Sequence, residues 1–193
     1  MSELRKENIK IDNREYVDPV KEVIHGKTYF LINASSIHAT IIRKLRDIFF
    51  LYFYNRKSNC LVYSEGLNIY LDEEDDNTYV IPDIVIVCDS SKFIEDGYRG
   101  IPELIVEVLS RKTRSKDRGI KFRLYEKSGV KEYWIIDPKS MSVEQYILKD
   151  GRYFLELLVS IEEDNDIEDA EEEESIMKSY VFEGMEVDFN NIF

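Results

Sequence analysis

Apolar positions recur along this chain with two periods, which separate the expected helices from the expected strands. Residues 35–59 carry apolar side chains at helical spacing, and a serine at the start of this segment can cap its first turn. Residues 113–129 form a second, basic amphipathic segment, capped by Thr113 and ended by Gly129. The two patterns predict two helices.

Strands are expected where apolar runs are short or alternate with polar residues. Two runs are continuous, "YVIPDIVIVCD" with Pro82 at the strand entry and "KEYWIIDP" at 131–138. Residues 142–160 alternate around "KDG", which predicts a hairpin. Shorter strands are expected at 28–33, at 60–71 with a break near Gly66, and close to the C-terminal end.

The stretch "LIVEVLS" at 104–110 predicts a strand that is buried on both faces. The helix at 113–129 would then cross over between this strand and its neighbour at 131–138. This order implies a mixed central sheet flanked by helices, an α/β or α+β fold. No repeat and no Pro/Gly/Ser linker divides the chain, so we expect one domain over residues 1–193.

The charge of the chain is unevenly distributed. The net charge is -13, but the run at 162–174 alone holds ten acidic residues and no Lys or Arg. We expect this run to be a solvated, disordered loop, with a nucleic-acid mimic or a regulatory tether as alternatives. The acidity argues against broad nonspecific coating of DNA and leaves room for a local catalytic cleft.

Several classes of protein are excluded by what the sequence lacks. No apolar run approaches the roughly 18 residues of a membrane span, and the charged residues 1–14, expected to be flexible, lack a signal-peptide core. Cys60 and Cys88 lie in apolar surroundings without a CxxC motif and are interpreted as small, reduced core residues. We therefore expect a cytoplasmic protein without a membrane partner.

Two of the expected strands carry an acid in an apolar setting, Asp83 and Glu107. If the strands are neighbours, the carboxylates converge and repel each other unless a cation lies between them. Mg²⁺, or Mn²⁺ in its place, takes hard oxygen ligands of this kind and can activate water and stabilise charge on a phosphate. Two alternatives stay open: Glu107 pairs with a buried Lys or Arg, and Asp83 hydrogen-bonds the backbone of a strand-entry turn.

A phosphodiesterase would also need a positive group near Glu107. Leu109, which shares the face of Glu107 on the strand, cannot supply it. The following helix offers three lysines, of which Lys121 lies among apolar residues and is best placed to face the sheet. The alternative for Lys121 is a helix-surface salt bridge with Asp117, four residues earlier.

Four stretches in this order, "PDIVIVCD", "ELIVEVLS", "TRSKDRGIKFRLYEKSGVKEYWIIDP" and "EGMEVDFNNIF", resemble the Uma2 family, formerly DUF820. That family belongs to the PD-(D/E)XK, or restriction-endonuclease-like, superfamily, and the resemblance is most specific over residues 79–138. It implies a restriction-endonuclease-like core with a C-terminal hairpin and a divalent metal. Asp83 and Glu107 would be the metal-binding acids, and Lys121 would replace the motif lysine, whose position is Leu109.

The resemblance also implies supporting residues. Asp117 and Tyr125 would flank the catalytic lysine, Glu22 matches the first acid of an upstream family element, and His38 matches a recurring family histidine. His38 and Tyr125 also have plainer explanations: a lone histidine at a helix start caps or packs, and a tyrosine at this spacing packs in the core.

Three hypotheses follow. The first is a Mg²⁺-dependent endonuclease that hydrolyses phosphodiester bonds in nucleic acid, with DNA favoured as substrate. The second is a catalytically inactive module that binds nucleic acid or a protein partner, favoured by Leu109 and by the acidity of the chain. The third is a structural domain whose buried acids form ion pairs. A homodimer rests on analogy with nucleases that cut both strands.

Overall fold

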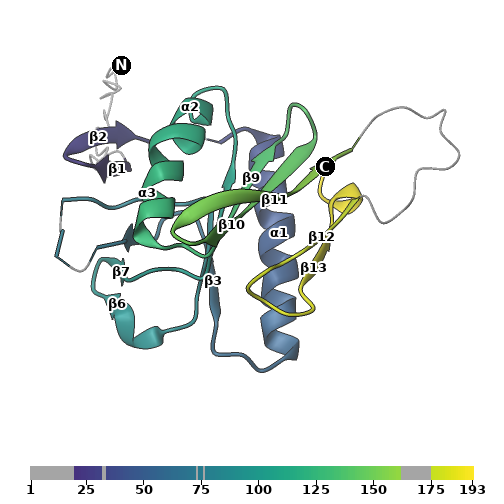
Figure 1. Cartoon of the computed structure of the whole chain (residues 1–193), viewed down its shortest axis with the longest axis horizontal. Helices are drawn as coiled ribbons and strands as arrows, with labels where there is room; N and C mark the ends of the chain where they lie inside the picture. The colour runs from purple at the N-terminus through teal and green to yellow at the C-terminus, as the bar shows by residue number, and fades with distance from the viewer. Residues whose placement is uncertain (1–19, 32–33, 73, 76, 162–174) are drawn as a thin grey trace, which may run out of the picture.

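The computed structural model describes residues 20–31, 34–72, 74–75, 77–161 and 175–193 (Figure 1). The expectations of a flexible start at 1–14 and a disordered acidic run at 162–174 lie outside these residues. The boundaries of a single domain stay a prediction.

A six-stranded mixed sheet forms the centre of the protein, in the order β11-β10-β9-β8-β5-β3. Only the β8–β9 pair is parallel, and the other four pairs within this sheet are antiparallel. The expected mixed sheet is therefore confirmed. Its strands are Leu61–Ser64 (β3), Ile84–Val87 (β5), Leu104–Val108 (β8), Glu132–Asp137 (β9), Ser142–Lys149 (β10) and Arg152–Ser160 (β11).

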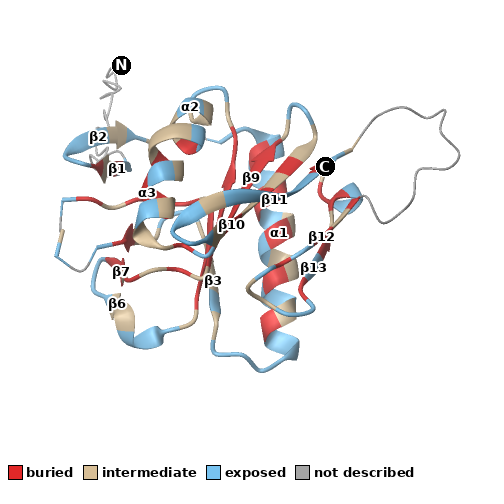
Figure 2. Cartoon of the chain, in the orientation of Figure 1, coloured by how far each residue is buried: buried red, intermediate tan, exposed pale blue. Residues whose placement is uncertain are grey.

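Helices cover both faces of this sheet (Figure 1). On one face, α1 (Ser36–Asn55) packs its buried residues with alternate strand positions such as Ile84, Val106 and Trp134. On the other face, α3 (Phe122–Ser128) packs with the remaining positions, such as Val85 and Ile105. Figure 2 shows the buried residues concentrated along these strands and on the inner side of α1. Both faces of the central strands are covered, which explains their continuous apolar runs.

The first helix is capped as the sequence predicts. The side-chain oxygen of Ser35 accepts a hydrogen bond from the backbone N–H of His38 at 3.3 Å. This bond satisfies one of the free amides of the first turn. It also fixes the point at which α1 begins, and with it the position of the His38 side chain.

The second helical segment is less regular than expected. It comprises α2 (Arg114–Lys116), a π-helical turn η2 (Asp117–Lys121) and α3. Thr113 does not cap it, because its hydroxyl accepts a hydrogen bond from the Ser110 amide at 3.1 Å instead. Gly129 ends the segment in a left-handed conformation with φ of 92°, as predicted. The segment connects the parallel neighbours β8 and β9, so the expected crossover is confirmed.

Three smaller sheets lie outside the central sheet, two of them two-stranded and one three-stranded, and the sequence predicted their strands only in part. The single strand expected at 28–33 is a hairpin, because His25 and Gly26 both adopt positive φ and form its turn. The loop expected after residue 89 contains a short helical turn and a small hairpin that pairs with β4. The expected C-terminal hairpin is present beside α1 (Figure 1). These elements are β1 (Lys21–Ile24), β2 (Lys27–Phe30), β4 (Asn68–Tyr70), η1 (Ser90–Lys92), β6 (Phe93–Ile94), β7 (Gly97–Arg99), β12 (Ile176–Lys178), β13 (Glu186–Asp188) and η4 (Phe189–Asn191).

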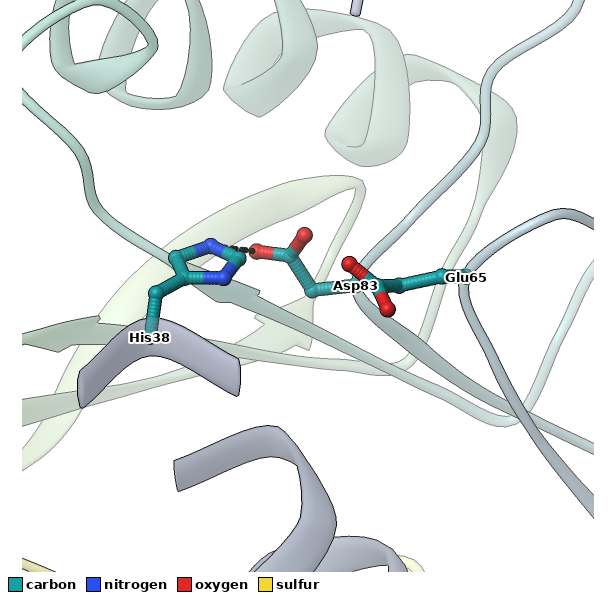
Figure 3. Close-up of side chains that lie close together, drawn as sticks. All are labelled: His38, Glu65 and Asp83. Carbon is teal, nitrogen blue, oxygen red and sulfur yellow. Dashed lines mark ion pairs between the residues drawn. The ribbon is translucent and has the colours of Figure 1, made fainter. Parts of the chain in front are cut away.

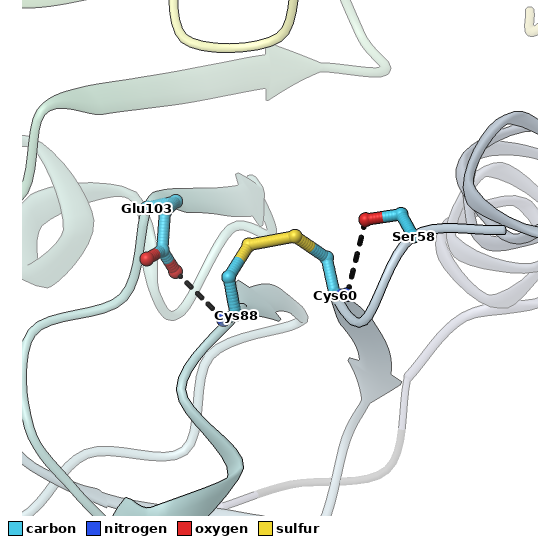
Figure 4. Close-up of a disulfide and its surroundings, with 4 residues drawn as sticks. All are labelled: Ser58, Cys60, Cys88 and Glu103. Carbon is cyan, nitrogen blue, oxygen red and sulfur yellow. Dashed lines mark hydrogen bonds between the residues drawn. A yellow bond between two sulfur atoms is a disulfide. The ribbon is translucent and has the colours of Figure 1, made fainter. Parts of the chain in front are cut away.

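The two cysteines form a disulfide, so the expectation of free, reduced cysteines is wrong (Figure 4). The register pairs Leu61 with Val87, which places Cys60 and Cys88 opposite each other at the next position. Local sequence could not reveal this, because β3 and β5 are joined by a long excursion through β4. Among the described residues no helix is long and apolar enough to cross a membrane. The cytoplasmic location stays a prediction.

Glu132, a buried acid in β9 of the central sheet, anchors the C-terminal segment. Its carboxylate is fully buried and accepts hydrogen bonds from five groups, at distances of 2.6 to 3.1 Å. The donors are Trp134 Nε1, Gln145 Nε2, Ser179 Oγ and the amides of Tyr180 and Val181. Among the described residues no Lys or Arg pairs with Glu132, so neutral donors alone stabilise this buried carboxylate.

Candidate active site

The two acids singled out from the sequence lie on neighbouring strands. The register pairs Ile84 of β5 with Val106 of β8, which places Asp83 opposite Glu107 at the same end of the sheet. The Val108 amide donates to Asp83 Oδ2 at 2.7 Å and ties the two strand ends together. The predicted convergence of the two carboxylates is therefore present in the structure.

Glu107 has two partners among the described residues, and both come from the helical segment that follows its strand. Lys121 Nζ lies 2.7 Å from Glu107 Oε1, and the Tyr125 hydroxyl donates to the same oxygen at 2.8 Å. All three side chains are almost completely buried. Leu109 packs in the core, so the cation beside Glu107 comes from the helix and not from the strand.

Lys121 bridges two acids. Its Nζ also lies 2.5 Å from Oε1 of Glu22, which is fully buried in β1. Glu22 pairs in addition with Lys116 and accepts a hydrogen bond from the Ile81 amide at 3.0 Å. Lys121 does not form the helix-surface salt bridge with Asp117 that its spacing allowed. It is only 2% exposed and points into the protein.

Asp117 is a further buried acid at the site. It is 1% exposed, and its Oδ1 has no hydrogen-bond partner among the described residues. Burial raises the pKa of this carboxyl, Lys121 opposes the shift, and the negative charge of Asp83 adds to it. An unsatisfied carboxylate oxygen in an apolar setting is costly unless a cation or a water contacts it.

His38 and Glu65 approach Asp83 from two other elements (Figure 3). His38, 7% exposed in the first turn of α1, places Nε2 3.2 Å from Asp83 Oδ2. Glu65 lies in the turn after β3 at a positive φ of 50°, and its amide donates to the Asp83 carbonyl at 3.1 Å. One potential ligand atom from each of the three residues lies within 4.8 Å of the others.

Sequence reasoning named His38 and missed Glu65. The only signal for Glu65 was the strand break at Gly66, and nothing in that signal places the turn beside Asp83. The structure thus brings together all the predicted site residues and adds one. Their catalytic and metal-binding roles stay predictions.

The electrostatics of the site reflect an excess of buried negative charge. The pKa of Glu107 is raised to about 8, mainly by burial. The nearby charges of Asp117, Asp83 and Glu22 contribute to this shift, and Lys121 opposes it. Burial alone would lower the pKa of Lys121, but Glu107 and Glu22 raise it, so the lysine stays protonated. Burial likewise opposes the charged form of His38, while Asp83 raises its pKa.

A cleft of about 1090 Å³ opens onto this group. Asp83, Glu107, Asp117 and Lys121 line it together with His38 and Glu65. Basic side chains from the surrounding loops and helix line the same cleft, namely Arg111, Lys112, Arg123 and Lys139. Acids and cations therefore share one cavity, as a site for a metal ion and a phosphate group requires.

The residues present fit a divalent cation. Asp83 and Glu107 offer carboxylate oxygens, which Mg²⁺ and Mn²⁺ prefer. Lys121 contacts Glu107 and Glu22, whereas Asp117 Oδ1 has no hydrogen-bond partner among the described residues. An added positive charge would relieve the excess of buried negative charge.

Comparisons with known proteins agree with this architecture. The model of the Uma2 family, described as "Putative restriction endonuclease", matches residues 12–175. A crystal structure from Anabaena variabilis, described as a "putative nuclease belonging to DUF820", aligns with a TM-score of 0.58 at 17% identity and covers 75% of this chain and 79% of that chain. This similarity shows the fold.

A relative of known sequence is an uncharacterized protein of Synechocystis sp.. It is 28% identical over 126 residues, which make up 65% of this chain. The chain spans 64% of the length of that relative.

Proposed function

This chain belongs to the Uma2 family, and on that premise we propose that it is a divalent-metal-dependent endonuclease that hydrolyses phosphodiester bonds in nucleic acid, with DNA as substrate. One observation carries the proposal: two acids on adjacent strands and a buried lysine line the same cleft. A purely structural ion pair would not need to face a cavity of this size.

Asp83 and Glu107 would hold the ion, Mg²⁺ or Mn²⁺. When bound, the ion supplies Lewis acidity that stabilises negative charge on the reacting phosphate. Asp83 is prepared for this role because the Val108 amide fixes one of its oxygens. Glu107 is fixed through Oε1 by Lys121 and Tyr125, so its side chain needs little reordering when a ligand binds.

Lys121 would stabilise the phosphate or orient the attacking water. An ammonium group has three N–H donors, and Glu22 and Glu107 each face one of them. Because Lys121 lines the cleft, we expect the third donor to contact an oxygen of the substrate there. Because the lysine is buried and paired, it stays charged and positioned, and such a preorganised donor is worth on the order of 100-fold or more in rate.

The substrate would contact the basic side chains of the cleft. Arg111 and Lys112 follow directly after β8, Arg123 lies on α3 and Lys139 follows β9. These groups give the cleft a local positive rim although the net charge of the chain is -13. We expect binding that depends on salt and remains local to the cleft.

The test compares cleavage of plasmid and single-stranded DNA, with Mg²⁺ or Mn²⁺, by wild type, Glu107→Gln and the control Glu183→Gln at an exposed position. We expect metal-dependent cleavage that Glu107→Gln abolishes and Glu183→Gln leaves intact. Full activity of Glu107→Gln would contradict the assignment.

The inactive binding module remains the second candidate, because Glu107 already has a cation and a hydroxyl as partners without any metal. Salt-sensitive DNA binding that ignores Mg²⁺ and survives Asp83→Ala would favour it. The homodimer stays a prediction under either hypothesis.

A further inference from the structure

Asp83 and Glu107 are not equally available to a metal ion. Glu107 is partly neutralised, since Lys121 and Tyr125 both contact its Oε1. Asp83 and Glu65, by contrast, form no ion pair with Lys or Arg within the described part of the chain, and Asp83 has His38 as its only charged partner there. The acids that still lack a cation therefore lie on the His38 side of the site.

We propose that His38 and Glu65 are direct ligands of the metal ion together with Asp83, so that the site binds Mn²⁺ or a similar transition-metal ion in preference to Mg²⁺. The proposal rests on the proposed function for the presence of a metal and adds two ligands and an ion preference to it.

The distances fit shared coordination. Neighbouring ligands of an octahedral ion with bonds of about 2.1 Å lie about 3 Å apart. His38 Nε2 and Asp83 Oδ2 are 3.2 Å apart, and a carboxylate oxygen of Glu65 is within 4.8 Å of both partners. The three side chains converge from α1, from the start of β5 and from the turn after β3 (Figure 3). An ion could bind between them with small side-chain movements.

Two buried polar atoms at the cleft have no hydrogen-bond partner among the described residues, His38 Nδ1 and Asp117 Oδ1. Both residues are more than nine-tenths buried and both line the cleft. His38 Nε2 faces the acceptor Asp83 Oδ2, so without an ion this nitrogen carries the ring proton. An ion that binds Asp83 would replace this proton, and the ring would then carry its proton on Nδ1, which no described residue contacts.

Glu65 is held beside Asp83 by the backbone and not by its own side chain. The turn at Glu65 and Gly66 has positive φ at both residues, and the Glu65 amide bonds the Asp83 carbonyl. Its carboxylate is exposed and forms no ion pair in the described region, so it can move onto an ion at little cost. Glu65 therefore suits a ligand that closes the open side of the site.

The donor set determines the ion preference. Imidazole nitrogen is a favourable ligand for transition metals, whereas Mg²⁺ takes oxygen ligands almost exclusively. A site with one nitrogen and carboxylate oxygens should bind Mn²⁺ more tightly than Mg²⁺. Without His38 the preference for Mn²⁺ over Mg²⁺ should become smaller.

The experiment titrates Mn²⁺ into the full chain and follows the free ion by electron paramagnetic resonance, with Mg²⁺ titrated by calorimetry. The variants are His38→Asn and Glu65→Gln. Their matched controls are His25→Asn, the other histidine, and Glu183→Gln, both exposed. We expect the Mn²⁺ dissociation constant to rise at least about 10-fold in each site variant and less than about twofold in each control. His38→Asn should also remove the nitrogen spin-echo modulation of bound Mn²⁺.

Each outcome has a definite meaning. Loss of the nitrogen signal together with a lower Mn²⁺/Mg²⁺ preference supports the proposal. Wild-type affinity in both site variants, with binding lost only in Glu107→Gln, would overturn it while leaving the proposed function intact. Failure of the wild type to bind either ion, with or without DNA, would overturn both. If His38→Asn does not fold, as judged by circular dichroism, Glu65→Gln at the exposed turn decides the question.

Discussion

Lys121→Met removes the only cation in the described residues that contacts both Glu22 and Glu107, and its effect on stability can be estimated from the contacts. Removing one partner of a buried ion pair costs about 3–5 kcal/mol. At neutral pH we expect the lower end, about 3 kcal/mol, for two reasons. Glu22 keeps Lys116 as a partner, and Glu107 can hold a proton because burial raises its pKa to about 8.

The loss of unfolding free energy in Lys121→Met should increase as the pH rises above about 8. Above its pKa, Glu107 is ionised in the native wild type, since Lys121 stays charged beside it. Without the lysine the pKa of Glu107 rises further, so the native variant keeps a proton that the unfolded chain has released. Its stability then falls by about 1.4 kcal/mol per pH unit. Between about pH 8 and 9.5 the deficit should increase by about 2 kcal/mol.

Urea denaturation in EDTA, followed by the fluorescence of the buried Trp134, measures both effects. Lys149→Met is the matched control, because Lys149 pairs with Glu156 at the surface of the β10–β11 hairpin. We expect little change in that variant at either pH. A loss for Lys121→Met no larger than the control, or one that does not grow above about pH 8, would refute the assignment of Lys121 as the buried counter-ion.

Two further predictions concern the scaffold around the site. Glu132→Gln replaces one carboxylate oxygen by an N–H₂ group that faces at least two donors, and should destabilise the fold by about 3 kcal/mol or more in urea. Glu183→Gln, at an exposed position, should cost clearly less, and equal losses would contradict the anchoring role. Reducing the Cys60–Cys88 disulfide, whose cysteines are 28 residues apart, should lower the unfolding free energy by about 3–4 kcal/mol. Mn²⁺ affinity should not change on reduction, since Cys88 and the site lie at opposite ends of β5; a coupled loss would refute that separation.

Local patterns in the sequence were enough to predict the elements that carry the site. Apolar continuity identified the buried strand around Glu107, and the turn sequence identified the β10–β11 hairpin, where Asp150 and Gly151 both have positive φ. These features depend on residues close together in the chain, so their signals survive in the sequence alone. The sequence left the neighbouring positions of β5 and β8 as a condition, and the register between them meets it.

The remaining features depend on contacts between distant segments. The disulfide joins β3 and β5, Glu65 meets Asp83 through a turn between two different sheets, and Lys121 finds its second acid, Glu22, 99 positions earlier in the sequence. Hydrophobic periodicity carries no information on such pairings, because it reports which face of an element is buried and not what covers it. The resemblance named Glu22 without indicating its partner.

The π-helical turn η2 has a consequence for how such a site can arise. A π turn closes its hydrogen bond one residue later than an α-helix does, and so contains one residue more. Each residue of an α-helix turns the chain by about 100° around the helix axis. One residue more or fewer in η2 would therefore rotate Lys121 by about this angle relative to the residues that precede the turn. An α-helical turn with one residue fewer would therefore present a different side chain to Glu22 and Glu107 in place of Lys121.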